Sequence, residues 1–171
     1  VKPWQATLMV GPSGAYRFIA EKPVLDPKAR SWCYAIDENH WLVGGAINNG
    51  GLALSWWRDA LNQTFTDKES TPLSFDDIIA LAAQVETGAE GLLCLPFFAG
   101  ERSPGWNIHA RGAFFGLSLA HDTRHMARAL LEGVAFRFRS LADVLEEIGA
   151  ELREVRASGG FTKSPQWLQI M

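Results

Sequence analysis

The stretch VRASGGFTKSPQW, residues 155–167, carries the pattern that decides the fold. A run of strand-like residues meets Gly159 and Gly160, and Ser164-Pro165 follows with the signature of a helix start. Glycine permits positive φ and lets the backbone approach a ligand without a Cβ atom. The first N–H groups of a helix lack partners and favour phosphate. The stretch therefore predicts a strand–turn–helix unit and a candidate phosphate-binding edge.

The composition is that of one globular domain. The chain has 171 residues, of which 47% are hydrophobic and 20% charged, and its net charge is −3 with both signs mixed along it. A nucleic-acid surface needs clustered basic residues, and the longest apolar runs are too short to span a bilayer. Cys33 and Cys94 stand alone, and the four histidines have no ligand spacing. We expect a cytoplasmic protein without a structural metal that binds neither nucleic acid nor a membrane.

The order of hydrophobic patterns predicts a mixed sheet with helices, an α/β architecture. Residues 62–72 and 96–112 are expected to be loops, and the second is long enough to be functional or mobile. Ser74 heads a capping box with Asp77, which starts a helix. Strands are expected at 6–10, 15–20, 31–36, 41–47, 91–95, 113–117 and 152–157, and helices at 52–61, 74–87, 123–148 and after 164. The stripe expected to be buried on the second helix is Phe75, Ile78, Ile79, Ala82 and Val85.

Glycine turns end three of these strands, at residues 11–14, 50–51 and 159–160. Ser13 adds a hydroxyl to the first turn, and the other two turns precede helices. None of the three matches the P-loop or Rossmann fingerprint. The residues alone therefore indicate an α/β domain with a phosphate-binding edge and no more specific function.

Five segments in this order give the chain a family resemblance. They are GPSGAYR, WLVGGAINNGGLALSWWRD, LPFFAGERSPGWNIHARGAFFGLS, ALLEGVAFRFRS and ASGGFTKSPQW. Together they resemble the C-terminal half of the FGGY carbohydrate kinases, and they cover essentially the whole chain. The GERSPGWN and ARGAFFGL portions look most like the gluconate kinase branch, and pentulose kinases such as xylulokinase have a related version.

The resemblance implies an actin-like, ribonuclease H-like ATPase domain with a mixed sheet flanked by helices. On this reading, residues 1–171 are a C-terminal nucleotide-binding domain that stops before its last helices. An N-terminal sugar-binding domain, outside these residues, would carry the aspartate that acts as base, so we expect no catalytic residue here. The expected ligands are ATP, Mg²⁺ and a sugar or sugar acid, and a homodimer stays open.

The resemblance also implies roles for individual residues. Gly159 and Gly160 match a glycine pair that lies against adenine and ribose, and Ser164 matches a nucleotide contact. Gly51 matches a glycine near the α- and β-phosphates. The turn that faces the β- and γ-phosphates would be formed by Gly11 and Ser13.

One residue departs from the family pattern. Relatives usually read Thr-x-Gly-Thr-Ser at the phosphate turn, whereas this chain reads MVGPS at residues 9–13. Both threonine hydroxyls are missing, and Pro12 has no N–H to donate. The departure leaves two readings open. Either the remaining donors suffice, or the protein is a weak kinase or a non-catalytic nucleotide- or partner-binding relative.

The loop 96–112 offers further candidates. Glu101 and Arg102 could face the substrate cleft and a sugar acid, or form a salt bridge within the loop. Arg111 could approach substrate or phosphate, and a structural role is the stronger expectation. Trp106 is expected to anchor the loop, and Glu132 is either a buried carboxylate near the cleft or an exposed one. Histidines 109, 121 and 125 are expected to be surface or capping residues.

Overall fold

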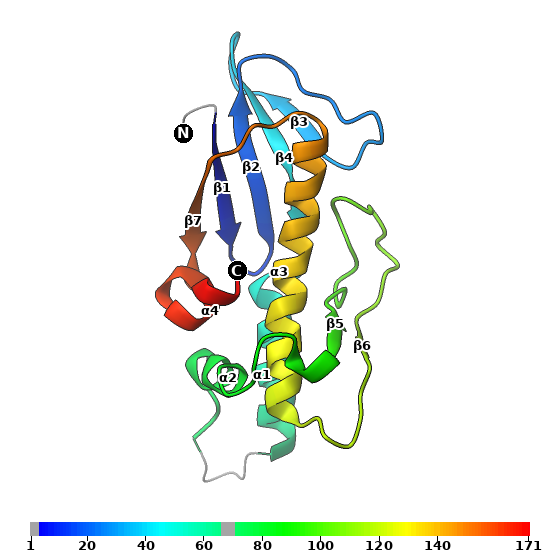
Figure 1. Cartoon of the computed structure of the whole chain (residues 1–171), viewed down its shortest axis with the longest axis vertical. Helices are drawn as coiled ribbons and strands as arrows, with labels where there is room; N and C mark the ends of the chain where they lie inside the picture. Colours follow the sequence, from blue (N-terminus) through cyan, green and yellow to red (C-terminus); the bar gives the residue numbers. More distant parts are fainter. Residues whose placement is uncertain (1–3, 66–70) are drawn as a thin grey trace.

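A five-stranded mixed sheet and a long helix dominate the computed structural model (Figure 1). The structure describes residues 4–65 and 71–171, so residues 66–70 of the expected loop lie outside it. The main strands are β1 (Gln5–Val10), β2 (Gly14–Ala20), β3 (Trp32–Ala35), β4 (Trp41–Ile47) and β7 (Glu154–Gly159). The remaining elements are α1 (Gly51–Phe65), α2 (Phe75–Ala82), η1 (Ala89–Gly91), β5 (Leu93–Leu95), β6 (Ala113–Phe115), α3 (Thr123–Glu147), η2 (Gly160–Lys163) and α4 (Pro165–Ile170).

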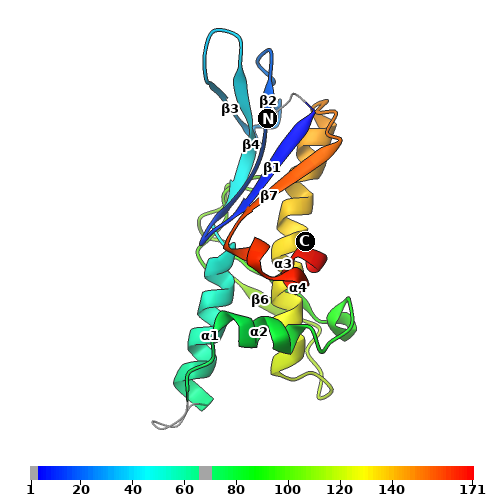
Figure 2. The same cartoon turned by 90° about the vertical axis from the view of Figure 1, so that its left-hand side faces the viewer.

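The strand order in the main sheet is β3-β4-β2-β1-β7, with β7 parallel to β1 and the other pairs antiparallel. The expected mixed sheet is confirmed. The strands at 91–95 and 113–117 were expected as single strands along an α/β order, but β5 and β6 pair with each other in a separate two-stranded sheet. Figure 2 shows α3 lying over one face of the main sheet.

The core lies between that sheet face and α3. Alternate residues of a strand point to opposite faces, so Ala6, Leu8 and Val10 of β1 face the helix and are buried. They meet an apolar stripe of α3 that recurs at helical spacing. Its buried members include Leu130, Val134, Phe138, Leu141 and Leu145. The expected apolar face of this helix is therefore confirmed.

Several boundaries differ from the expectation. Helix α1 runs on to Phe65, so the expected loop does not begin at residue 62, and β7 ends at Gly159 instead of residue 157. Helix α2 has the expected capping box of Ser74 and Asp77 but ends at Ala82, five residues before Thr87. The expectation that Phe75 is buried is wrong: it is 41% exposed, whereas Ile78 and Ile79 are buried. A short 3₁₀ turn, η2, begins at Gly160 and separates Gly159 from α4, whose N-cap is Ser164.

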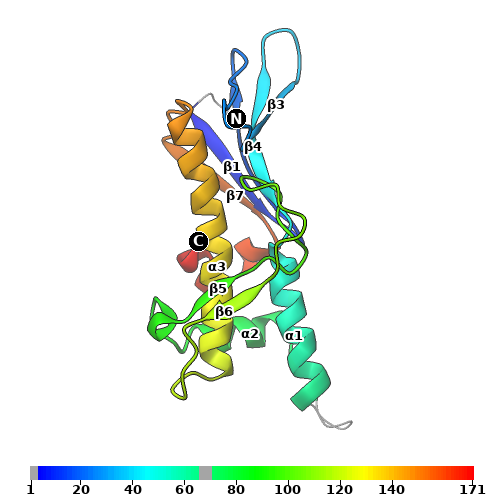
Figure 3. The same cartoon turned by 90° about the vertical axis from the view of Figure 1, so that its right-hand side faces the viewer.

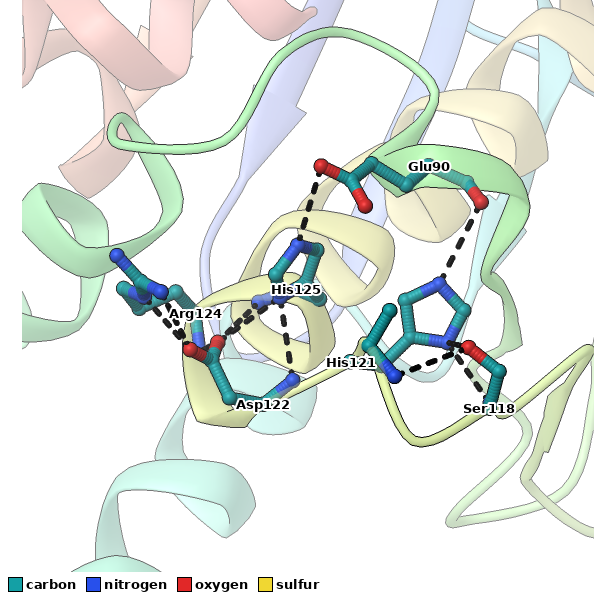
Figure 4. A network of polar contacts seen from close by, with 7 residues as sticks. Glu90, Ser118, His121, Asp122, Arg124 and His125 are labelled. Atoms are coloured by element: carbon teal, nitrogen blue, oxygen red, sulfur yellow. Dashed lines mark hydrogen bonds and ion pairs between the residues drawn. The ribbon is translucent and has the colours of Figure 1, made fainter.

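The start of α3 explains two of the histidines (Figure 4). Asp122 is the N-cap, and its carboxylate accepts from the N–H of Arg124 at 2.9 Å. His125 completes a capping box and is buried. The ring of His121 contacts the carbonyl of Glu90 and the N–H of Ser118, at 3.4 and 3.0 Å. Capping is thus confirmed for His125, while a surface position is not.

In residues 4–65 and 71–171, no three histidine, cysteine or acidic side chains gather as a metal site would require. Within the same ranges, every helix is too short or too polar to cross a bilayer. Cys33 and Cys94 are free thiols, and burial raises the pKa of Cys94 to about 12.

Asp26 clamps the loop between β2 and β3. Its carboxylate accepts from the N–H and Nε of Arg30, at 2.7 and 2.9 Å. The hydrogen bond from the Arg30 side chain is the main reason that the pKa of Asp26 falls to about 2. Because this pKa lies below that of the unfolded chain, about 3.9, the clamp stabilises the loop fully above about pH 4. We predict that this stabilisation is lost as the pH falls toward 2.

Hydrogen exchange at the Arg30 amide would measure this clamp. Its protection should weaken progressively between about pH 4 and pH 2, after correction for the intrinsic exchange rate. The Asp26→Asn variant serves as the control, because its side chain does not titrate and its protection should not fall over this range. Equal pH dependence in both proteins would contradict the prediction.

Candidate functional site

A cavity of about 650 Å³ lies where the ends of β1 and β7 meet three helices. This volume falls within the range of small-molecule sites. The expected site residues that line it are Gly11, Gly51, Gly160 and Ser164, together with Pro12. The rest of the wall is Val10, Leu54, Ser55, Ser74, Phe75, Asp76, Ile79, Phe161, Lys163 and Trp167. Residues from four parts of the sequence thus converge on one apolar cavity with a few polar groups.

The turn at 11–13 packs directly against the start of α1. The N–H of Gly51 donates to the carbonyl of Gly11 at 2.7 Å, and the N–H of Leu52 donates to the carbonyl of Pro12 at 2.9 Å. The N–H of Gly50 also donates to Pro12, at 3.0 Å. The expected unpaired N–H groups are therefore absent at Gly51 and Leu52, because the turn uses both. A Cβ on Gly51 would lie 3.0 Å from the Gly11 oxygen, so this glycine permits the backbones to approach.

The two glycines after β7 have different environments. Gly159 has φ of 105°, and a Cβ there would lie 2.1 Å from the Val10 oxygen. The fold itself therefore requires Gly159 to be glycine. A Cβ on Gly160 would meet no described protein atom within 4 Å, and Gly160 lines the cavity. Of these two glycines, Gly160 is the one that leaves open space for a ligand.

Three wall residues add chemistry that the glycine turns do not supply. Phe75 presents an exposed ring with the Arg58 guanidinium 4.2 Å above its centroid. Lys163 contributes a cation and Asp76 a carboxylate. The positions of Lys163 and Asp76 come from tertiary packing, and no local sequence pattern marks either residue. Ser164 is 8% exposed, and its hydroxyl accepts from the N–H of Trp167 at 3.2 Å, which is its capping role.

Ser13 lies on the other side of the turn. It does not line the 650 Å³ cavity but a separate depression of about 250 Å³. Arg102, one of the expected substrate-cleft residues, lines the same depression. The turn that contains Gly11, Pro12 and Ser13 therefore separates two hollows, one on each side.

Comparison with known proteins assigns this architecture. The family model for the C-terminal domain of the FGGY family of carbohydrate kinases matches residues 6–171. The chain belongs to the FGGY family. The gluconokinase of Bacillus licheniformis is 41% identical to it over 174 residues, which are 100% of this chain and 34% of the relative. The chain thus spans about a third of the length of that FGGY protein.

Two solved FGGY structures share the fold. The gluconate kinase of Lactobacillus acidophilus is 37% identical, with a TM-score of 0.81 over 97% of this chain and 32% of its own. The xylulose kinase of Rhodospirillum rubrum is 35% identical, with a TM-score of 0.85 over 100% of this chain and 33% of its own. The expected actin-like, α/β architecture is confirmed. Kinases of different sugars match this FGGY chain almost equally well in shape.

The loop 96–112 of this FGGY chain is held by the junction between β4 and α1 (Figure 3). Asn49 donates to the carbonyl of Gly100 at 2.9 Å and accepts from the N–H of Ala99 at 2.9 Å. The N–H of Ser103 donates to the carbonyl of Ala46 at 3.0 Å. Asn48 donates to the carbonyl of Ala99 at 2.8 Å, so both asparagines of the NNGG segment fasten the loop, while its glycines pack against the turn at 11–13.

Two of the expected substrate-cleft residues have structural contacts. Glu101 pairs with Arg137 of α3, so its salt bridge joins the loop to a helix and does not lie within the loop. Arg111 donates to the carbonyls of Ile108 and Ala110, at 3.3 and 3.0 Å, within its own loop. The indole N–H of Trp106 donates to the carbonyl of Ala29 at 2.8 Å, which confirms the anchoring role.

Glu132 is a buried carboxylate, which settles one of the open alternatives. It is 7% exposed and accepts from the N–H of Gly88 at 2.9 Å. It also pairs with Arg128, one turn earlier on α3, at 2.5 Å. Its partners connect α3 to the segment after α2, so it does not line the 650 Å³ cavity.

Proposed function

We propose that this chain is the nucleotide-binding part of an ATP-dependent sugar kinase, and that the acceptor is gluconate, converted to 6-phosphogluconate. The observation that carries the proposal is the cavity in which Gly11, Gly51, Gly160 and Ser164 converge. The identity to a gluconokinase, 41%, supports the choice of acceptor. The catalytic base and the main sugar site are then supplied by a domain outside these residues.

The cavity fits a nucleotide in four respects. Its volume of about 650 Å³ suits a ligand of this size. Gly160 and Phe161 form an apolar part of the wall against which a base and ribose would lie. Gly160 has no Cβ, so the ligand could approach its backbone closely. Lys163 provides a cation for phosphate. Asp76 is a carboxylate in the wall, and Mg²⁺ bound with nucleotide phosphates commonly takes one or two protein carboxylates.

The chain's own contribution is to position groups and stabilise charge. ATP, when bound, supplies the phosphoryl group and Mg²⁺ supplies charge neutralisation. Gly160 leaves room for the nucleotide, and residues 11 and 12 of the turn form one end of the cavity wall. Lys163, and the Ser13 hydroxyl on the other side of the turn, would donate hydrogen bonds to phosphate oxygens. In this proposal none of these residues removes a proton from the acceptor.

A substrate panel with the full protein tests the proposal. We expect ATP-dependent phosphorylation of gluconate with a higher kcat/KM than for xylulose or ribulose. The chain of 171 residues alone serves as the control and should be inactive. A preference for a pentulose would support the alternative that the similarity to the xylulose kinase of Rhodospirillum rubrum favours. Turnover of gluconate by the isolated chain at a normal kinase rate would contradict the proposed division of roles.

Pro12 motivates a second candidate, a relative that binds nucleotide or a partner without catalysis. Pro12 lines the cavity but has no N–H, and its carbonyl is occupied by Gly50 and Leu52. Pro12→Thr keeps this carbonyl and adds an N–H and a hydroxyl. A hydrogen bond to a charged phosphate contributes about 1.5–3 kcal/mol, so kcat/KM for ATP should rise about tenfold or more. An unchanged kcat/KM would mean that the turn does not limit a kinase.

A further inference from the structure

The depression on the far side of the turn has the composition of an anion site. Its wall contains two arginines, Arg17 and Arg102, and the part of the chain that the structure describes contributes no carboxylate to it. Trp32 and Tyr34 form another part of the wall, with stacked rings 4.8 Å apart at their centroids. The remaining lining residues are Met9, Ser13, Gly14, Ala15, Leu42 and Ala46.

The fold explains why both arginines reach this hollow. Arg17 alternates along β2 with the buried Tyr16 and Phe18, so its side chain projects from the sheet face opposite α3. Pairing between β3 and β4 stops at Trp32 and Gly44. Beyond that point the loop 96–112 lies along the edge of β4, where the N–H of Ser103 donates to the carbonyl of Ala46. Arg102 is the residue before Ser103.

Neither guanidinium group forms an ion pair with a described residue. Most arginines of the chain pair with a carboxylate, as Arg30 does with Asp26. Within the described ranges Arg17 and Arg102 have no acidic partner, and the Arg17 Nη2 contact is the Met9 sulfur at 3.8 Å. A thioether is a weak acceptor, so the Arg17 donors are available for a stronger one. Guanidinium groups bind carboxylates through paired, parallel hydrogen bonds.

We propose that Arg17 and Arg102 bind the carboxylate of the acceptor and so select a sugar acid over a neutral sugar. This inference rests on the proposed kinase function. Ser13 lines this depression, whereas Gly11 and Pro12 of the same turn line the nucleotide cavity. The phosphoryl donor and the sugar-acid acceptor would therefore meet at residues 11–13. Arg17 lies three residues beyond Gly14, about 10 Å along an antiparallel strand, which separates the carboxylate from the end of the acceptor that receives the phosphoryl group.

Steady-state kinetics of the full protein test this with gluconate and its neutral amide, gluconamide. Arg17→Met should raise KM for gluconate at least tenfold, because a charge-assisted hydrogen bond is lost. The KM for ATP should stay within twofold, and kcat/KM for gluconamide should not fall. Arg102→Met should act in the same direction, and Arg17→Lys should recover part of the loss. Arg153→Met, at a different depression beside Trp4, is the matched control and should change neither KM.

The outcomes separate the two proposals. A wild-type protein that ignores gluconate would contradict the proposed acceptor before any variant is compared. A protein active on gluconate whose Arg17→Met variant keeps the same KM would overturn only the carboxylate site. An equal rise in KM for gluconate and ATP would also overturn it, since the arginine would then act on phosphate. Unchanged thermal unfolding of Arg17→Met shows that the variant is folded.

Discussion

Replacing Gly160 with valine is expected to remove most nucleotide affinity and leave the fold intact. A side chain at this position meets no described protein atom within 4 Å of its Cβ, and the backbone φ lies outside the left-handed region. The new methyl groups would instead enter the 650 Å³ cavity. Overpacking costs about 1–3 kcal/mol, so the Kd for ATP should rise by about one to two orders of magnitude.

Gly159→Ala is the matched control and should have the opposite profile. Its backbone has φ of 105° and ψ of −178°, a region that is nearly exclusive to glycine. Its Cβ would also lie 2.1 Å from the Val10 oxygen, where a backbone carbonyl has no freedom to move away. We expect a loss of about 3 kcal/mol or more in the free energy of unfolding, since backbone strain and overpacking add.

Urea unfolding and ATP titration of both variants measure the two effects. Gly160→Val should unfold at the urea midpoint of the unsubstituted protein and bind ATP weakly. Gly159→Ala should unfold at a lower midpoint and, at low urea, bind ATP with nearly unchanged Kd. If Gly160→Val bound ATP normally, the nucleotide would lie elsewhere, and the proposed function would lose its main support.

The contrast between these glycines shows where sequence reasoning stops. The pattern at residues 155–167 predicted the strand, the turn and the helix start, because strand residues, glycine and Ser-Pro each have strong local preferences. It assigned one role to both glycines. Their difference arises because β7 pairs in parallel with β1, which brings the Val10 carbonyl onto Gly159 alone. That contact joins residues almost the whole chain apart, and no local pattern contains it.

Phe75 and Asn49 illustrate the same limit in the site. Helical spacing placed Phe75 on the apolar stripe, but periodicity does not distinguish a core from a ligand cavity. The sequence predicts a glycine turn at residues 50–51 and gives no separate role to the asparagines before it. Asn49 instead fastens residues 99 and 100, some fifty positions later. Regular elements are thus predictable from nearest-neighbour preferences, whereas the site depends on contacts between distant loops.

The largest stability effect on the helical side is expected from Glu132→Met. The side chains of Glu132 and Arg128 are 9% and 12% exposed, so removal of the carboxylate leaves a buried guanidinium without its counter-charge. The N–H of Gly88 also loses its acceptor. Breaking one partner of a buried pair costs about 3–5 kcal/mol, and we expect a loss of this size in the free energy of unfolding.

The double variant Arg128→Met/Glu132→Met separates charge from packing. Replacing both partners with apolar residues of similar volume removes the uncompensated charge, so much of the lost stability should return. The exposed Gly88 N–H and the exposed Thr87 hydroxyl, which accepts from Arg128 at 2.8 Å, exchange these partners for water, so recovery should be incomplete by about 1 kcal/mol for each hydrogen bond. Urea midpoints at pH 7 measure all three proteins. A double variant no more stable than Glu132→Met would show that the hydrogen bond to Gly88, and not the buried charge, is what the carboxylate contributes.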